Sequence, residues 1–303
     1  MRLKSKFEAG EFVILAEMEP PKGIDVSEMV ANAMKVKGRV DAFVIPEMSS
    51  AVMRMSALGG AMVLQAQGMD TVMQVCCRDR NRIALQADML AGNACGISNV
   101  MAVTGENPSF GDHHDAKAVY DIELIELLRA AQDLQCGRDM AGIELNGSPE
   151  FYMGSTVNAG ASGQALELEL EELNKKVEAG ARFFVTPPVF DLEAIGPFLK
   201  RVEKLDIQVL PTVLLLKSLG MARYIDRNLD NVFIPKSIIQ RIQKAGDKVR
   251  ECSRIAAEML SSLKSEGFSG VMLSTLGWED RIPEILDGAQ KTVQSRKDQA
   301  ADN

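Results

Sequence analysis

The sequence predicts an α/β protein folded as a (β/α)8 barrel, or TIM barrel, and three observations support this fold class. Eight short apolar runs recur along the 303 residues. Each run is continuous rather than alternating, which is typical of parallel strands that are buried on both faces. Helical patterns separate the runs, as they do in a barrel of strand–helix units. An open doubly wound sheet is the alternative, but no GxGxxG motif follows the first run.

The predicted strands follow one another at regular intervals. They are residues 12–17, 41–46, 71–76, 99–104, 140–145, 182–186, 207–212 and 270–275. Amphipathic segments between them predict helices, for example 82–94, 123–134 and 165–180, the last of which ends in a typical glycine stop. Residues 217–268 are long enough for two or more extra helices before the last strand. We therefore expect one barrel domain over residues 1–290 and a polar C-terminal tail over 291–303.

The composition limits the classes of function. Hydrophobic residues make up 46% of the chain and charged residues 25%, which are globular values. The net charge of −8 argues against nucleic-acid binding. No apolar run approaches the ~20 residues of a membrane span, and no signal segment is apparent, so we expect a soluble, cytoplasmic protein without membrane contact. Five cysteines form no CxxC pair, and His113 and His114 are the only histidines. We therefore expect no disulfide framework and no metal site, and assign acid–base chemistry to carboxylates, lysine or tyrosine.

Polar residues gather where the predicted strands end. Because a barrel enzyme carries its active site at the C-terminal ends of its strands, this pattern favours an enzyme. The residues are Glu17, Glu19, Glu47, Arg78, Asp79, Arg80, Gly105, Glu106, Glu144, Asn146, Thr186, Thr212, Ser274 and Thr275.

The end of the first predicted strand carries two glutamates, Glu17 and Glu19, immediately before Pro20 and Pro21. Residues two apart in a strand share a face at a spacing of roughly 6.5–7 Å. A carboxyl group that follows an apolar strand can be partly buried, and burial or a nearby like charge raises its pKa. Such a group can donate a proton near neutral pH.

Five motifs, in order along the chain, resemble the methylenetetrahydrofolate reductase family. They are AEMEPPKG (16–23), QVCCRDRNR (74–82), NVMAVTGENP (99–108), LNKKVEAGARFFVTPPVFD (173–191) and TLGWED (275–280). The resemblance extends over roughly residues 10–290. It implies a (β/α)8 barrel that holds a non-covalent flavin at the strand ends. It also implies an oxidoreductase that reduces 5,10-methylenetetrahydrofolate to 5-methyltetrahydrofolate by hydride transfer from reduced flavin.

Aligning the double proline with the family pattern implies that Glu17 is the catalytic acid, which protonates N10 of the substrate as its five-membered ring opens. Glu19 then stands where the family has an aromatic residue. Glu106 matches a family aspartate that lies near both flavin and folate, so the resemblance implies roles for it in catalysis and in binding of cofactor and substrate. Thr275 is the second substrate contact that the resemblance implies.

The resemblance implies FAD as the cofactor, with FMN as the alternative. The flavin contacts that it implies are Gln74, Thr104, Gly105, Glu106, Glu144, Ser148, Glu169, Glu172, Lys175 and Lys176. From the residues alone, Glu172 and Lys176 are equally consistent with a solvated ion pair on one helix face.

Three further residues depart from the family pattern: Pro187 replaces a glutamine, Pro46 a threonine and Trp278 an arginine. A proline offers no side-chain hydrogen-bond donor. The electron donor is therefore either NAD(P)H or a partner subunit that delivers electrons, in a homo- or hetero-oligomer. The alternative to a flavin reductase is a non-flavin barrel that binds a pterin for methyl transfer, or a degenerate structural subunit of a one-carbon complex.

Overall fold

The computed structural model describes the backbone of residues 2–301 and the side chains of residues 2–292, and within them it shows the predicted barrel. The strands pair in chain order, all parallel, and the last pairs with the first to close the barrel. They are β1 (Val13–Glu17), β2 (Ala42–Ile45), β3 (Thr71–Cys76), β4 (Asn99–Val103), β5 (Tyr152–Thr156), β6 (Phe183–Pro188), β7 (Gln208–Leu214) and β8 (Gly270–Ser274).

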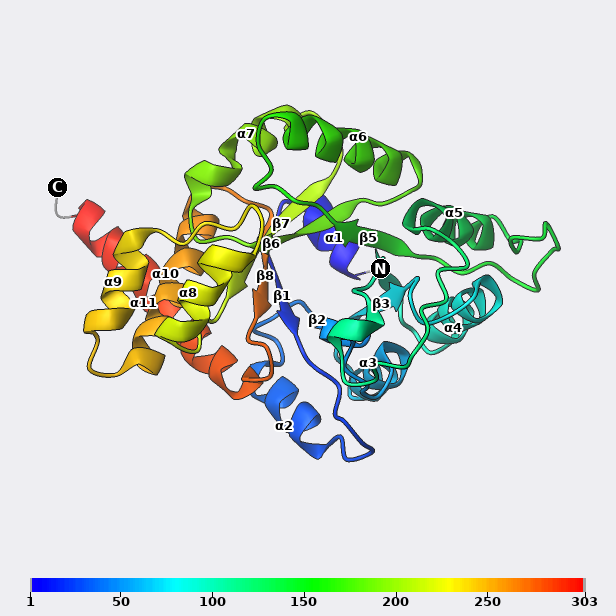
Figure 1. Ribbon diagram of the computed structural model, residues 1–303, viewed down its shortest axis with the longest axis horizontal. Coiled ribbons are helices and arrows are strands. Elements are labelled where there is room, and N and C mark those ends of the chain that lie inside the picture. The colour runs from blue at the N-terminus through cyan, green and yellow to red at the C-terminus, as the bar shows by residue number, and fades with distance from the viewer. Residues whose placement is uncertain (1, 302–303) are drawn as a thin grey trace.

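Helices surround this barrel (Figure 1). They are α1 (Arg2–Glu8), α2 (Ser27–Val36), α3 (Ala57–Ala66), α4 (Arg82–Ala94), α5 (Leu124–Gln135), α6 (Gln164–Glu178), α7 (Leu192–Val202), α8 (Leu219–Asn228), α9 (Lys236–Lys244), α10 (Lys248–Ser265) and α11 (Ile282–Ala301). Short 3-10 helices lie at η1 (Ser49–Ala51), η2 (Pro108–Phe110) and η3 (Glu279–Arg281). Side chains of Ser56, Asn81 and Asp247 cap the N-termini of α3, α4 and α10, as the residue preferences at these positions predict.

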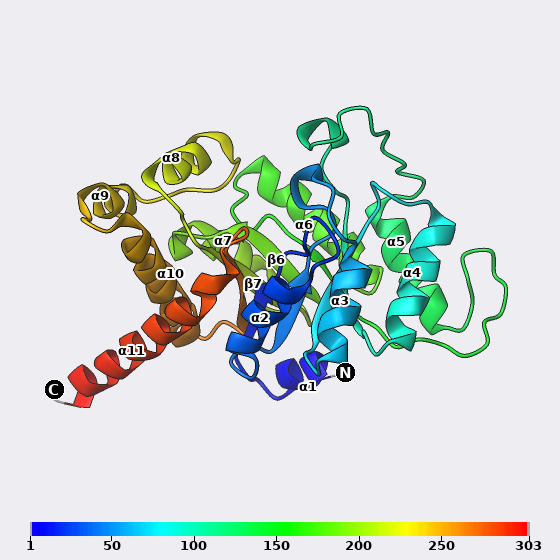
Figure 2. The same ribbon diagram turned by 90° about the horizontal axis from the view of Figure 1, so that it is seen from below.

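The extra helices before the last strand are confirmed as α8, α9 and α10. They lie together on one side of the barrel, next to α11 (Figure 2). The backbone of α11 continues to Ala301, into the segment predicted as a polar tail, and residues 302 and 303 of that segment lie outside the described residues. Within the described part of the chain, no helix has both the length and the apolar character that a membrane span requires.

The barrel has its own apolar interior, separate from the layer between strands and helices. Val13 and Leu15 of β1 belong to it, together with inward residues of the other strands. Leu3 and Phe7 of α1 also belong to this cluster, and the ring of Phe7 lies 6.0 Å from that of Tyr152 at the start of β5. The helix α1 therefore closes the end of the barrel where the strands begin, and leaves the opposite end for a site.

The predicted fifth strand is wrong. Residues 140–145 form a loop in which Ile143 is 64% exposed, and β5 begins at Tyr152. The sequence from Gly154 onwards reads as a flexible loop because glycine, serine and threonine are frequent there. Gly154 is nevertheless a strand residue, and a Cβ atom on it would lie 2.2 Å from the ring of Phe183. The glycine therefore makes room for an aromatic ring inside the barrel.

Candidate active site

The mouth of the barrel is lined by polar side chains at the C-terminal ends of the strands. Successive strand residues face opposite sides of a sheet, so the residues two after an inward apolar residue also face inward. Leu15, Val72, Tyr152, Leu210 and Met272 are interior residues. The same alternation directs the side chains two residues further along towards the mouth: Glu17, Gln74, Thr212 and Ser274, and also Thr156, which lies four residues after Tyr152.

Glu17 is the most strongly perturbed acid at this mouth. It is half-buried at the end of β1, and Ser274 Oγ of the neighbouring strand β8 donates a hydrogen bond of 2.8 Å to Glu17 Oε1. Burial raises the pKa of Glu17 to about 7, the hydrogen bond from Ser274 lowers it, and the carboxylates of Glu19 and Glu279 raise it. A carboxyl group in this state exchanges its proton near neutral pH.

Glu19 lies at the edge of the mouth within a cluster of charged groups. Arg54 Nη2 is 3.0 Å from Glu19 Oε2. The backbone N–H of Glu19 donates to Glu279 Oε1 at 3.4 Å. Glu279 is 8% exposed, and burial is the main reason that its pKa is raised. Glu17 therefore has two further carboxylates on one side, of which Glu19 has an arginine partner.

Gln74 is held at the mouth by the loop that follows β2. Its Oε1 accepts a hydrogen bond of 3.1 Å from the backbone N–H of Glu47. Glu47 itself is buried, accepts from the first N–H of α3 at Ala57 over 2.7 Å, and forms an ion pair with Arg80 at 3.0 Å. Burial raises the pKa of Glu47 although Arg80 opposes this shift. Glu47 therefore ties the β2–α3 loop to the end of β3 and positions Gln74.

The predicted Thr104–Gly105–Glu106 stretch lies directly after β4. Gly105 has a φ of +87°, and a Cβ atom there would lie 2.4 Å from Cys76 Sγ, so this position requires glycine. Thr104 and Glu106 are exposed. The buried guanidinium of Arg78 donates to the backbone oxygen of Glu106 at 3.3 Å, and its Nη1 lies 3.9 Å from the Glu106 carboxylate. The buried Arg78 side chain thus holds the backbone of this stretch, while the Glu106 carboxylate faces solvent.

A pocket of about 360 Å³ lies between the C-terminal ends of β5 and β6. It is lined by Thr156, Val157, Asn158, Glu169, Lys176, Val185, Thr186 and Pro187. Lys176 is 8% exposed, and its Nζ donates to the backbone oxygen of Thr156 at 2.9 Å. Burial lowers the pKa of Lys176, and its nearest carboxylate, Glu169, is 3.9 Å away. The Oδ1 atom of Asn158 is buried and has no hydrogen-bond partner.

The alternative interpretation of Glu172 and Lys176 as an ion pair on one helix face is wrong. Glu172 forms its ion pair with Lys175 instead, and both side chains are about half exposed on α6. Lys176 lies one residue further round the helix, so its side chain is directed inward to the strand end. Of the two adjacent lysines, only Lys176 lines the pocket.

Three other predicted site residues are not at the mouth. Glu144 and Ser148 precede β5, so they lie at the opposite end of the barrel from the C-terminal strand ends. Their prediction depended on the misplaced fifth strand. Thr275 is 1% exposed, and its Oγ1 has no hydrogen-bond partner. Strand alternation turns Thr275 towards the helices and places its neighbour Ser274 in the mouth.

The sequence alone shows Glu19 near Glu17 but not the residues that come from distant parts of the chain. Ser274 was recognisable as a polar strand end, but a continuous apolar run does not reveal which of two adjacent residues faces inward. Arg54 lies in a loop and Glu279 in η3, both 35 or more residues from Glu19 along the chain, and no local pattern predicts their proximity. Their roles become visible only once the barrel is closed.

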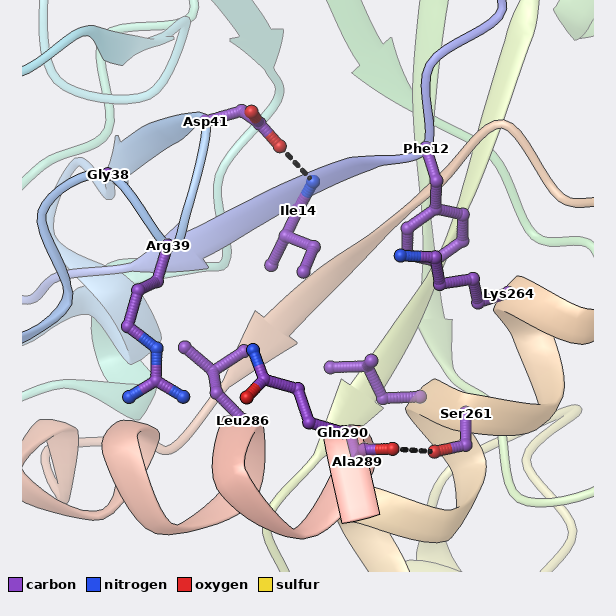
Figure 3. A pocket seen from close by; sticks show the side chains of 11 residues that line it. Phe12, Ile14, Gly38, Arg39, Asp41, Ser261, Lys264, Leu286, Ala289 and Gln290 are labelled. Atoms are coloured by element: carbon purple, nitrogen blue, oxygen red, sulfur yellow. Dashed lines mark hydrogen bonds between the residues drawn. The ribbon is translucent and has the colours of Figure 1, made fainter. Parts of the chain in front are cut away.

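A second pocket, of about 430 Å³, lies away from the mouth, between the start of β1 and the helices α10 and α11 (Figure 3). Figure 3 shows Asp41 accepting a hydrogen bond from the Ile14 backbone, and Lys264 next to the Phe12 ring. None of the predicted site residues lines this pocket. The candidate active site is therefore the mouth around Glu17 and the adjoining β5–β6 pocket.

The chain is similar to known proteins in both sequence and structure. The family model described as methylenetetrahydrofolate reductase matches residues 2–290. Methylenetetrahydrofolate reductase 2 of Schizosaccharomyces pombe (strain 972 / ATCC 24843) is 23% identical over 190 residues, which are 61% of this chain and 29% of that protein. The match thus spans less than a third of the length of that relative.

Among solved structures, EDTA monooxygenase (EmoA) from Chelativorans sp. BNC1 is similar, with a TM-score of 0.55 and 12% identity over 94% of both chains. At this identity the likeness shows the fold alone. The resemblance inferred from the five motifs is confirmed by the family model, which covers nearly the whole chain. The chain belongs to the methylenetetrahydrofolate reductase family.

Proposed function

We propose that this protein is a flavin-dependent oxidoreductase that reduces 5,10-methylenetetrahydrofolate to 5-methyltetrahydrofolate. The main support for the proposal is the raised pKa of Glu17, about 7, at the mouth of a barrel of this family. The substrate must open its five-membered ring before hydride reaches the methylene carbon, and ring opening requires a proton on N10. Glu17 is proposed to supply that proton.

The environment of Glu17 suits a general acid. Near neutral pH the group is divided between its protonated and ionised forms, so it can give up a proton and regain it in each cycle. Ser274 holds one carboxyl oxygen, Oε1, in a fixed direction. The Ser274 hydroxyl thereby restricts the rotation of the carboxyl group, which reduces the entropy cost of reaching a productive geometry.

The β5–β6 pocket has the groups that a flavin requires. Lys176 offers a buried positive charge, and Asn158 Oδ1 is a buried acceptor without a donor. A ligand that carries a phosphate and a hydroxyl-bearing chain would satisfy both. Lys176, Asn158, Glu169 and Gly105 are the residues proposed to hold it. When bound, the flavin supplies the hydride. FAD is proposed because it is the usual cofactor of the family, with FMN as the alternative.

Glu106 is proposed to bind the amino groups of the pterin ring. Its carboxylate is 59% exposed, and its nearest cation, Arg78, is 3.9 Å away and already holds Asp79 through two short hydrogen bonds. The carboxylate thus has free acceptor capacity towards a ligand. The backbone of the same stretch is fixed by Arg78, so Glu106 projects from a rigid base.

We propose that electrons come from a partner subunit rather than from nicotinamide bound beside the flavin. Pro187 lines the β5–β6 pocket, where the family has a glutamine, and it can donate no hydrogen bond to a nicotinamide amide. Direct use of NAD(P)H is the alternative. Purified protein that oxidises NADH or NADPH with added flavin and without another protein would support that alternative.

The experiment that tests the proposed function has two parts. The purified protein, with FAD or FMN added, should show flavin absorbance bands after gel filtration. Glu17→Gln should still bind flavin and permit its chemical reduction, while turnover of methylenetetrahydrofolate by the reduced enzyme should fall by about 10²-fold or more, as when a general acid is lost. Unchanged turnover would contradict the role of Glu17. A colourless protein that binds tetrahydrofolate would favour the non-flavin pterin-binding alternative, which Pro46 and Pro187 support.

A further inference from the structure

The ion pair between Glu19 and Arg54 lies next to the proposed acid and has no assigned role. Glu19 is two residues beyond Glu17, in the loop that leaves β1. Arg54 comes from the segment between η1 and α3, and its Nη2 lies 3.0 Å from Glu19 Oε2. Its Nη1 donates to the backbone oxygen of Pro20 at 3.3 Å, so the guanidinium is attached to the same loop at two points.

The pair is more than a surface contact. The side chains of Glu19 and Arg54 are 18% and 28% exposed, and Arg54 Nε is buried without a hydrogen-bond partner. Exposed ion pairs contribute little because water screens them, whereas charges in such a part-buried position act on their neighbours over several ångströms. Position 19 is Glu in this chain, where the family pattern has an aromatic residue, so the negative charge is a departure from that pattern.

Among the described side chains, the groups around Glu17 come from several different elements. The β1–α2 loop contributes Glu19, and η3 contributes Glu279, whose Oε1 accepts from the backbone N–H of Glu19. Strand β8 contributes the Ser274 hydroxyl, and β2 is followed by Pro46, which has no charge. These carboxylates do not form a metal site, since no group of three or more acidic, histidine or cysteine side chains with metal-binding geometry occurs in the described part of the chain.

We propose that Glu19 and Arg54 are positioning residues that together set the pH at which Glu17 gives up its proton. Glu19 repels the ionised form of Glu17, and Arg54, paired with the Glu19 carboxylate, offsets part of that repulsion. The inference rests on the proposed function for its catalytic meaning, but the effect on Glu17 is a property of the protein without flavin or folate.

Removing Glu19 and removing Arg54 should move the titration of Glu17 in opposite directions. Loss of a purely structural ion pair would not have opposite effects. Glu19→Gln keeps the side-chain shape, removes the repulsion and leaves the Arg54 charge, so Glu17 should lose its proton about 0.5 to 1.5 pH units lower than in the unmodified protein. Arg54→Met leaves Glu19 uncompensated, so Glu17 should lose its proton at a higher pH. Arg54→Lys keeps the charge and should stay near the unmodified value.

The titration of Glu17 can be followed directly by ¹³C NMR of protein labelled at the glutamate carboxyl carbons, with Glu17→Gln identifying the signal. In parallel, the rate of methylenetetrahydrofolate reduction is measured against pH, where loss of the Glu17 proton produces the decline at high pH. Glu167→Gln is the matched control. It removes one carboxylate from an ion pair, with Arg201 at 2.6 Å, on the outer surface of α6, and should move neither curve.

Opposite displacements of the Glu17 titration in Glu19→Gln and Arg54→Met, with Glu167→Gln unchanged, support the proposal. Equal titrations in all four proteins, or displacements in the same direction, overturn it. The two proposals fail separately. Displaced NMR titrations in a protein that does not reduce folate would contradict the proposed function alone, whereas normal turnover with an unmoved high-pH decline would contradict the role of the Glu19–Arg54 pair alone.

Discussion

Ser274 Oγ donates a 2.8 Å hydrogen bond to Glu17 Oε1 across the pair of strands that closes the barrel. The two residues are 257 positions apart in the sequence and adjacent in the mouth. The bond favours the ionised form of Glu17 and so opposes the effect of burial. The hydrogen bond from Ser274 is therefore one of the factors that set the pKa of Glu17.

Ser274→Ala should raise the pKa of Glu17 above its present value of about 7, because the hydrogen bond that lowers it is lost. The decline of folate reduction at high pH should move to higher pH, and the rate should also fall because the carboxyl group is less well oriented. Ser261→Ala is the matched control. Ser261 is a buried serine whose Oγ donates to Ala289 O at 2.9 Å, away from the mouth, so its removal should affect stability and leave the pH profile in place.

Glu17 should reduce the stability of the fold as the pH rises. Its pKa is about 7 in the folded protein and about 4.5 when water surrounds it. The folded state therefore binds more protons than the unfolded state between these values. The free energy of unfolding should fall from about pH 4.5 to pH 7, by at most about 3 kcal/mol, and stay low above that range.

Glu17→Gln removes this dependence. The variant should gain stability relative to the unmodified protein as the pH rises from 5 to 8, although it loses activity. Urea unfolding at both pH values measures the difference. If the difference in the free energy of unfolding between the two proteins does not change with pH, the pKa of Glu17 is not raised. Glu167→Gln serves for comparison, because Arg201 lowers the pKa of Glu167 and its neutralisation should not stabilise the protein at pH 8.

Lys176 and Lys175 provide a matched pair for testing the flavin site. Lys176 is buried at the β5 end, whereas Lys175 is exposed and paired with Glu172. Lys176→Met should weaken flavin binding by about 10-fold or more, the value of a lost charge-assisted hydrogen bond, and Lys175→Met by about two-fold or less. Fluorescence titration with FAD and FMN measures both. Equal losses in the two variants would place the flavin phosphate elsewhere.

Gly154 should be intolerant of any side chain. A Cβ atom there would lie 2.2 Å from the Phe183 ring, so Gly154→Ala should destabilise the fold by about 1–3 kcal/mol. Gly220→Ala is the control, since its Cβ would have ordinary contacts in α8 and should be neutral or slightly stabilising. Chemical denaturation measures both. Phe183→Leu in the Gly154→Ala background should recover part of the loss, and a strictly additive double variant would contradict the steric explanation.

The strands that the sequence predicted correctly are those made of continuous branched and apolar residues. Strand β5 was missed because its role in the barrel requires Gly154 beside Phe183, and a glycine followed by Ser155 and Thr156 has the composition of a loop. The catalytic candidate Glu17 was predictable because two prolines mark its position. Its surroundings were not, since Ser274, Glu279 and Arg54 reach the mouth through the closure of the barrel.

The pairing of β1 with β8 also affects how the protein forms. During synthesis, β1 emerges early and keeps one edge unpaired until residues 270–274 follow. Contacts between such distant segments form slowly, and an unpaired strand edge is open to association with other chains until then. The proposed acid acquires Ser274 only in this closing step. A chain that stops before β8 would therefore contain Glu17 without the hydroxyl that orients it, and activity would report directly on completed closure of the barrel.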